Sequence, residues 1–109
     1  MATIRFGQLG QLKPEKIEQY CALHANPWPE VLQTITACNL RNYSIFLQGD
    51  KVFAYFEYVG DDFEADMAKM AADPTTQKWW DIVKPLMDPL PDRAEGEFWS
   101  GMTEVYHLD

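Results

Sequence analysis

The sequence offers few side chains that could move a proton near neutral pH. It contains two histidines, His24 and His107, and Tyr20 precedes His24 by four residues. Residues four apart lie on one face of a helix, so the phenol and the imidazole are predicted to lie one turn apart. Histidine is the side chain whose ordinary pKa lies nearest to neutrality, which makes His24 the candidate acid or base. The alternative is that both rings are half-buried packing residues at a helix end.

Two adjacent tryptophans, Trp79 and Trp80, are the second unusual feature. Neighbouring residues on a helix point about 100° apart, so one indole can pack inside while the other faces a pocket or an interface. Indole faces suit the C–H faces of sugars, and the indole N–H can donate to a hydroxyl. Tyr43 begins a predicted strand, and strand ends commonly border pockets. The alternative is one tryptophan in the core and one at a dimer contact.

The sequence lacks the motifs that hold metals, nucleotides or hydrolytic nucleophiles. It has no HxxxH or CxxC pair, and no GxSxG, GxGxxG or P-loop segment. We therefore expect neither a metal ion nor another cofactor. The remaining chemistry is that of one titratable group with polar and aromatic walls, which suits proton transfer on a small molecule.

Charge and hydropathy restrict the partners and the compartment. The net charge is −8, with 9 Lys and Arg against 17 Asp and Glu, which argues against binding to nucleic acid or to an anionic membrane. No apolar run approaches the ~20 residues of a membrane-spanning helix, and residues 1–10 lack the pattern of a signal peptide. We expect a cytoplasmic protein in which Cys21 and Cys38 are reduced thiols in the core.

Periodicity and breakers predict a single domain over residues 1–109 in which strands and helices alternate. Strands are predicted over residues 4–12, 42–48, 51–59 and 103–108, and helices from Pro14, from Pro29, and over residues 61–72 and 75–84. The two glycines of the first strand indicate a bulge, and Gly49-Asp50 is typical of a tight hairpin. Residues 88–101 are predicted to form a loop. This β-α-β-β-α-β order is the ferredoxin-like plan of an α+β protein.

Both faces of the third predicted strand are largely apolar, which one layer of helices cannot cover. The residues that alternate along it are Val52, Ala54, Phe56 and Tyr58 on one face and Phe53, Tyr55, Glu57 and Val59 on the other. A second copy of the chain can supply the missing cover, so we predict a homodimer whose sheets pack face to face. The alternative is a monomer in which the loop over residues 88–101 acts as a lid.

Four short motifs resemble those of the L-rhamnose mutarotase family, in the same order and at compatible distances across nearly the whole chain. The family patterns Y-x3-H-x3-W-P-E, N-Y-x-I, W-W and E-V-F-x-L correspond to residues 20–30, 42–45, 79–80 and 104–108. The resemblance implies the subunit of a dimeric α+β barrel and an enzyme that interconverts the α and β anomers of a 6-deoxy sugar. It implies that His24 is the proton donor. It implies that the sugar-binding positions are Tyr20, Tyr43, Trp79 and Trp80.

Mutarotation opens a hemiacetal ring and closes it on the other face, with one proton delivered to the ring oxygen and one removed from the anomeric hydroxyl. We expect His24 to deliver the first proton, while a tyrosine, Glu30 or water are the candidates for the base. The run after Trp80, which includes Pro89 and Trp99, departs from the short bacterial members, so L-rhamnose, L-fucose and related aldoses stay open as substrates. The alternatives are a cofactor-free monooxygenase of the same barrel type and a sugar-binding protein without catalytic activity.

Overall fold

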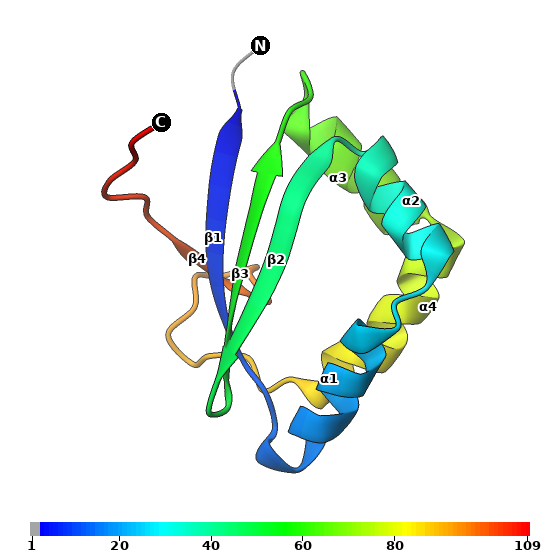
Figure 1. The fold of residues 1–109 in the computed structure, drawn as a ribbon, viewed down its shortest axis with the longest axis vertical. Helices are drawn as coiled ribbons and strands as arrows, with labels where there is room; N and C mark the ends of the chain where they lie inside the picture. The colour runs from blue at the N-terminus through cyan, green and yellow to red at the C-terminus, as the bar shows by residue number, and fades with distance from the viewer. Residues whose placement is uncertain (1–2) are drawn as a thin grey trace.

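The computed structural model describes residues 3–109; residues 1–2, the start of the segment predicted not to be a signal peptide, lie outside the described residues. Four antiparallel strands form one sheet in the order β2-β3-β1-β4, and the helices cover one of its faces (Figure 1). The elements are, in chain order, β1 (Ile4–Gln11), the 3-10 turn η1 (Pro14–Lys16), α1 (Ile17–Ala25), α2 (Pro29–Ala37), β2 (Leu40–Gln48), β3 (Lys51–Tyr58), α3 (Phe63–Ala72), α4 (Pro74–Val83), the 3-10 turn η2 (Lys84–Leu86) and β4 (Ser100–Met102).

This order of strands and helices confirms the predicted α+β, ferredoxin-like subunit, with each helical crossover divided into two short helices. Pro29 and Pro74 begin α2 and α4, where the fixed φ of proline and its missing N–H suit the first helical position. The carboxylates of Asp62 and Asp73 cap α3 and α4 by accepting hydrogen bonds from backbone N–H groups. Prolines and caps, which the sequence shows directly, therefore set the helix boundaries.

The sheet departs from the prediction at its bulge. β2 and β3 are joined at Gly49-Asp50 as predicted, with Gly49 at a φ of 62°. β1 pairs with β3 in an unbroken register along its whole length, so the bulge predicted for the first strand is wrong. The bulge lies in β2 instead, where the register shifts between Arg41 and Ser44. The glycine at position 10 of β1 is explained by packing, since a Cβ there would lie 3.0 Å from the ring of Trp99.

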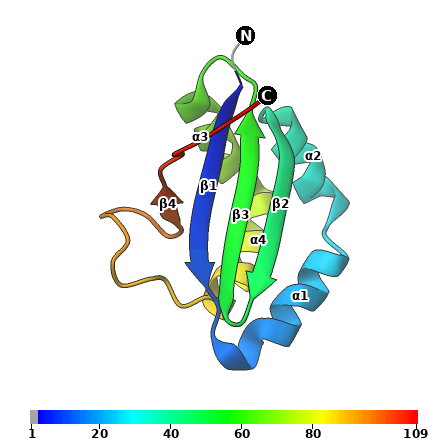
Figure 2. The same ribbon diagram turned by 60° about the vertical axis from the view of Figure 1, so that its left-hand side comes forward.

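The closing strand also differs from the prediction, which placed it at residues 103–108. β4 is the short segment Ser100–Met102, paired with β1, and no strand follows it in the described residues. The following tail, residues 103–109, crosses the outer face of the sheet, the face without helices (Figure 2). Arg5 on that face holds Glu104 through two hydrogen bonds of 2.8 and 3.0 Å. This pairing draws the chain away from the edge of β1, and Val105 is left 92% exposed.

Two clusters of buried apolar side chains lie between the helices and the sheet. One of them includes Leu12, Tyr20, Val31, Val52, Trp79 and Leu86. Cys38 is buried in the other cluster, as predicted, whereas Cys21 is exposed, so its predicted place in the core is wrong. Cys21 follows the buried Tyr20 by one residue, which turns its side chain about 100° around α1 towards solvent. Both thiols are free.

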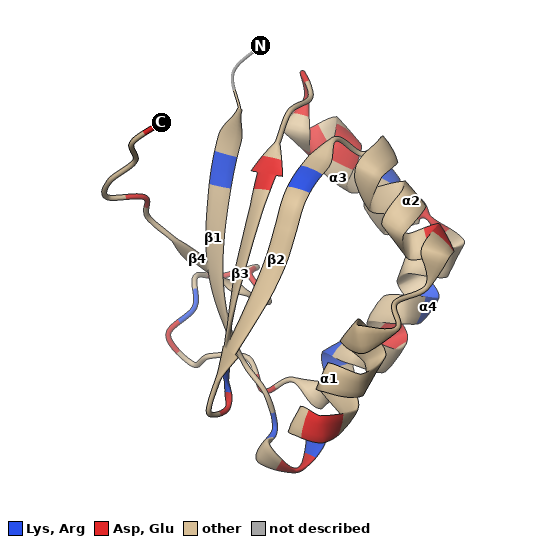
Figure 3. Cartoon of the chain, viewed as in Figure 1, with Lys and Arg blue, Asp and Glu red and all other residues tan. Residues whose placement is uncertain are grey.

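Two features of the described residues bear on possible partners, the apolar length of the helices and the distribution of charge. Among the described residues, no helix has the length and hydropathy that a bilayer crossing requires. Over the described residues, Lys and Arg are scattered over strands, helices and loops, and Asp and Glu lie among them (Figure 3). The formal charge of −8 is thus spread over the fold.

Candidate functional site

A cavity of about 560 Å³ opens between the helical layer and β2. This volume lies within the range of about 300–1,000 Å³ that is usual for small-molecule pockets. Four of the five predicted site residues line the cavity, namely His24, Tyr43, Trp79 and Trp80. They come from α1, β2 and α4, segments far apart in the sequence, which the ferredoxin-like crossovers bring together.

The imidazole of His24 is fixed by the backbone of its own helix. Its Nδ1 lies 2.9 Å from the carbonyl oxygen of Tyr20, one turn earlier in α1. A carbonyl oxygen can only accept a hydrogen bond, so Nδ1 carries a proton and donates it. This leaves Nε2 as the ring nitrogen that can give or take a proton from a ligand in the cavity. The half-buried position of His24 keeps the ring within reach of the cavity and of solvent.

Aromatic rings bracket His24 on two sides. The ring of Tyr20 stacks on the imidazole at 4.2 Å between centroids, and Trp79 meets it edge-on at 5.4 Å. Tyr20 is only 3% exposed and stands behind His24, so it does not line the cavity. Burial raises the pKa of the Tyr20 hydroxyl well above its ordinary value, which keeps the phenol neutral. The spacing of four residues thus brought the two rings together, with only the imidazole on the cavity wall.

Tyr43 reaches the cavity from the sheet. Its ring lies 5.2 Å from that of Phe56 on β3, on the face of the sheet that the helices cover. Burial raises the pKa of the Tyr43 hydroxyl, although 41% of the residue's surface is exposed. We attribute this combination to a hydroxyl that lies deeper than the rest of the side chain. A phenol with a raised pKa stays protonated and can donate a hydrogen bond to a sugar oxygen.

The two tryptophans differ in burial, as the helical geometry predicts, but both border the cavity. Trp79 is buried in the core and touches Trp28 edge-on at 5.2 Å between centroids. Trp80 is half-buried, and the ammonium group of Lys84 lies 4.5 Å from its ring centre. Both indoles line the cavity, so each presents part of its surface to a ligand.

Sequence reasoning missed the apolar and the remaining polar parts of the wall. The additional lining residues include Val31, Leu32, Ile35, Ile45 and Met70 among the apolar ones and Arg41, Asn42 and Thr76 among the polar ones. The apolar spacing along α2 was visible in the sequence, but the face that borders a cavity follows only from how helices pack on the sheet. Glu30, a candidate for the base, is exposed and does not line the cavity. No three His, Cys, Asp or Glu side chains gather as a metal site among the described residues.

Fold and site together define a class, the ferredoxin-like α+β subunit with a small-molecule cavity walled by an imidazole, a phenol and indoles. Comparison with known proteins gives the particular family. Residues 5–108 match the model of the family described as L-rhamnose mutarotase. The chain belongs to the L-rhamnose mutarotase family.

Individual relatives agree with this assignment over nearly the full chain. The L-rhamnose mutarotase of Lactiplantibacillus plantarum is 36% identical over 108 residues, covering 97% of this chain and 99% of that protein. The L-rhamnose mutarotase of Oceanobacillus iheyensis is 34% identical over 107 residues, covering 96% of this chain and 98% of that protein.

Solved structures show the same fold. L-rhamnose mutarotase FA22100 from Formosa agariphila superposes with a TM-score of 0.76 at 24% identity, covering 97% of this chain and 99% of that one. Tetracenomycin F2 cyclase from Streptomyces glaucescens, a polyketide cyclase, reaches a TM-score of 0.72 at 17% identity, covering 97% of both chains. Similarity at these identities concerns the fold alone, and the fold is therefore shared with proteins of different chemistry.

Proposed function

We propose that this chain, as a single domain over residues 1–109, interconverts the α and β anomers of L-rhamnose, with His24 as the acid. The observation that carries the proposal is the hydrogen bond from Nδ1 of His24 to the carbonyl of Tyr20. This bond leaves Nε2 as the free ring nitrogen of a residue that lines the cavity. Family membership supplies the reaction and the sugar, and the fixed imidazole supplies the proton.

The reaction needs two proton transfers and no net oxidation. Nε2 of protonated His24 gives its proton to the ring oxygen, the bond between that oxygen and the anomeric carbon breaks, and the anomeric hydroxyl loses its proton to a base. The open aldehyde turns about its C1–C2 bond, and the same steps in reverse close the ring on the other face. The raised pKa of Tyr43 suits a hydroxyl donor better than a base. We therefore assign the base to water, with Tyr43 orienting the sugar.

The apolar part of the wall suits a deoxy sugar. L-Rhamnose carries a methyl group where the parent aldose carries a hydroxymethyl group, and Ile35 and Val31 present aliphatic surface to the cavity. A methyl group loses nothing on leaving water for such a surface, whereas a hydroxyl without a partner loses its hydrogen bonds. The faces of Trp79 and Trp80 are suited to the C–H faces of the sugar ring.

Saturation-transfer NMR on purified protein tests this function. The anomeric proton of one anomer is saturated, and the loss of signal from the other gives the exchange rate. With L-rhamnose we expect exchange to rise in proportion to protein concentration, and to rise less with L-fucose and L-mannose. No acceleration at any protein concentration refutes the proposal, and binding without acceleration supports a sugar-binding protein instead.

We also propose that two copies of the chain pack through the outer faces of their sheets. That face carries Phe46, which is 62% exposed, beside Phe53 at 6.3 Å between ring centroids, and Met102 is exposed nearby on β4. An exposed apolar surface of this kind is costly in water and is typical of an interface. Light scattering should give twice the 12.6 kDa of one chain, and Phe46→Lys should shift the mass towards one chain. A wild-type protein with the mass of a single chain contradicts this assembly.

A cytoplasmic location is the third proposal. Cys21 and Cys38 are both free thiols, and unpaired cysteines are usual in reducing compartments. Cell fractionation with detection of the native protein tests the location, and recovery in an exported fraction would contradict it.

A further inference from the structure

The bulge in β2 decides which face of the sheet carries Tyr43. The register of β2 on β3 shifts by one residue between Arg41 and Ser44, so Asn42 and Tyr43 together occupy the place of one residue. With that extra residue, Tyr43 lies against Phe56 on the cavity side. Alternation without the bulge would place Tyr43 on the outer face, because successive side chains of a strand point to opposite faces. The phenol therefore depends on the bulge for its place in the cavity wall.

Asn42 has the irregular backbone conformation of the bulge. Its φ of 52° lies in the left-handed region, which Asn adopts more readily than most residues with a side chain. Its amide Nδ2 donates to Oε1 of Glu57 at 3.0 Å, and its carbonyl oxygen accepts from the hydroxyl of Ser44. The bulge is thus tied to β3 by a side-chain bond where the regular backbone ladder is interrupted.

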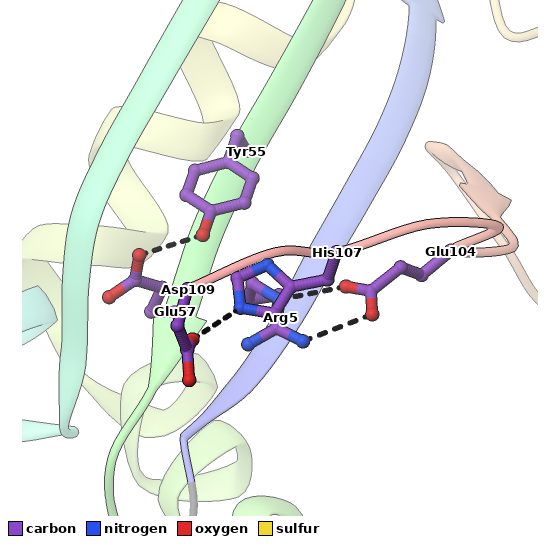
Figure 4. A network of polar contacts seen from close by, with 6 residues as sticks. All are labelled: Arg5, Tyr55, Glu57, Glu104, His107 and Asp109. Carbon is purple, nitrogen blue, oxygen red and sulfur yellow. Dashed lines mark hydrogen bonds and ion pairs between the residues drawn. The ribbon is translucent and has the colours of Figure 1, made fainter.

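Glu57 stands on the outer face, opposite the cavity. Its second oxygen, Oε2, accepts from the hydroxyl of Tyr55 at 2.7 Å (Figure 4). Together with the bond from Asn42, both carboxylate oxygens are in use. The two donors lower the pKa of Glu57, with a smaller contribution from the positive charge of Arg5. The tail brings His107 to this face, and Glu104 holds Arg5 there. Glu57 is consequently an ionised acceptor held in one position, and it does not line the cavity.

We propose that Glu57 is a positioning residue for the sugar-binding hydroxyl of Tyr43, acting through Asn42 and the bulge. The carboxylate on one face of the sheet fixes the backbone that delivers the phenol to the other face. This inference rests on the proposed function, because its kinetic consequence is read through L-rhamnose. Loss of the tether loosens the bulge and weakens the hydrogen bond from Tyr43 to the sugar, whereas His24 is untouched.

The kinetic experiment compares Glu57→Ala with Glu57→Gln, in which the amide oxygen can still accept from Asn42. We expect Glu57→Ala to raise KM for L-rhamnose by up to about tenfold, the contribution of one hydrogen bond, with a smaller change in kcat. Glu57→Gln should restore most of the affinity. Tyr55→Phe removes the other donor and keeps the tether, so it is the matched control and should leave KM nearly unchanged. A wild-type KM in Glu57→Ala overturns the proposal.

A double-mutant cycle decides whether the effect passes through Tyr43. In a Tyr43→Phe background, where the hydroxyl is already absent, Glu57→Ala should raise KM no further. Asn42→Gly keeps the left-handed backbone but lacks the amide, and Asn42 also lines the cavity. This variant should therefore raise KM at least as much as Glu57→Ala, and the two together should be no worse than Asn42→Gly alone. An undiminished effect of Glu57→Ala in the Tyr43→Phe background overturns the proposal, since the residue would then act by another route.

A second readout does not depend on activity. In protein labelled with ¹³C at the tyrosine rings, the Tyr43 signal is assigned by its loss in Tyr43→Phe. Glu57→Ala should shift or broaden this signal, and Glu57→Gln should leave it close to its wild-type position. An unchanged Tyr43 signal in Glu57→Ala refutes the positioning role even if the protein proves inactive on L-rhamnose. Failure of the positioning role and failure of the proposed function are thereby separated.

Discussion

Replacement of His24 separates the chemical role of the imidazole from its role in packing. His24→Phe keeps an aromatic ring between Tyr20 and Trp79 and removes both nitrogens. His24→Gln keeps a polar side chain and removes the ring. If Nε2 delivers the proton, both variants should lose about 10²–10⁴-fold in kcat, which corresponds to about 3–5 kcal/mol of transition-state stabilisation.

The two variants should differ in stability, because only His24→Phe keeps the aromatic contacts of the imidazole. The imidazole makes two aromatic contacts, at 4.2 Å with Tyr20 and 5.4 Å with Trp79. Such pairs contribute about 0.5–1.5 kcal/mol each, so His24→Gln should cost about 1–3 kcal/mol of unfolding free energy. His24→Phe should retain most of this. The Phe variant is therefore the informative one, because it should be folded and inactive.

The assay is anomer exchange by saturation transfer at equal concentrations of folded protein, with urea unfolding of each variant as the control. Two outcomes are distinguishable. Loss of exchange in both variants, with near wild-type stability in His24→Phe, supports His24 as the general acid. An exchange rate in His24→Phe close to wild type refutes the reasoning, since the ring would then be only a wall of the cavity.

Three further predictions concern stability, acid sensitivity and specificity. Gly10→Ala should lower the unfolding free energy by about 1–3 kcal/mol in urea titrations, because the new Cβ lies 3.0 Å from the ring of Trp99; an unchanged midpoint would contradict this close packing. The hydroxyl of Tyr58 donates to Asp66 and lowers the pKa of that carboxyl below the ordinary 3.8. The contribution of ionised Asp66 to the free energy of unfolding is therefore present above pH 3.8 and is lost as the pH falls through the lower pKa of the folded state. Asp66→Asn should therefore melt below wild type at neutral pH, with a difference that narrows in acid; a constant difference would argue against the linkage. Ile35→Thr should reduce the preference for L-rhamnose over L-mannose by about tenfold in kcat/KM, because a hydroxyl in the apolar wall can pair with that of L-mannose; an unchanged ratio would place the methyl group elsewhere.

The parts of the fold that the sequence predicted are those with local causes. Pro29 and Pro74 begin helices, and Gly49-Asp50 turns the hairpin, because each acts through the φ values of its own residue. These signals were sufficient for the ferredoxin-like order and, with the four motifs, for the family, and both are confirmed. The bulge was assigned to the wrong strand because a glycine in a strand has several causes, and at Gly10 the cause is a neighbouring indole ring.

The site was predictable where helical spacing alone decides proximity. Tyr20 and His24 are in contact as their spacing indicates, but their depth depends on how α1 packs, and only the imidazole lines the cavity. The aliphatic wall around Ile35 needs the packing of α2 over β2, which no window of sequence contains. The roles of these residues stay predictions until the variants are measured.

The two strand errors, one in β2 and one at the end of the chain, have the same physical origin. Alternation indicates that a segment can form a strand, but it does not identify the neighbour or the register. In β2 one extra residue at Asn42 reverses the face of Tyr43, and at the end of the chain the pairing of Arg5 with Glu104 directs the tail across the sheet. Both departures from the regular pattern meet at Glu57 on the outer face. Local irregularity is expected where function requires a particular side-chain direction, and the sugar-binding role proposed above for Tyr43 would be such a requirement.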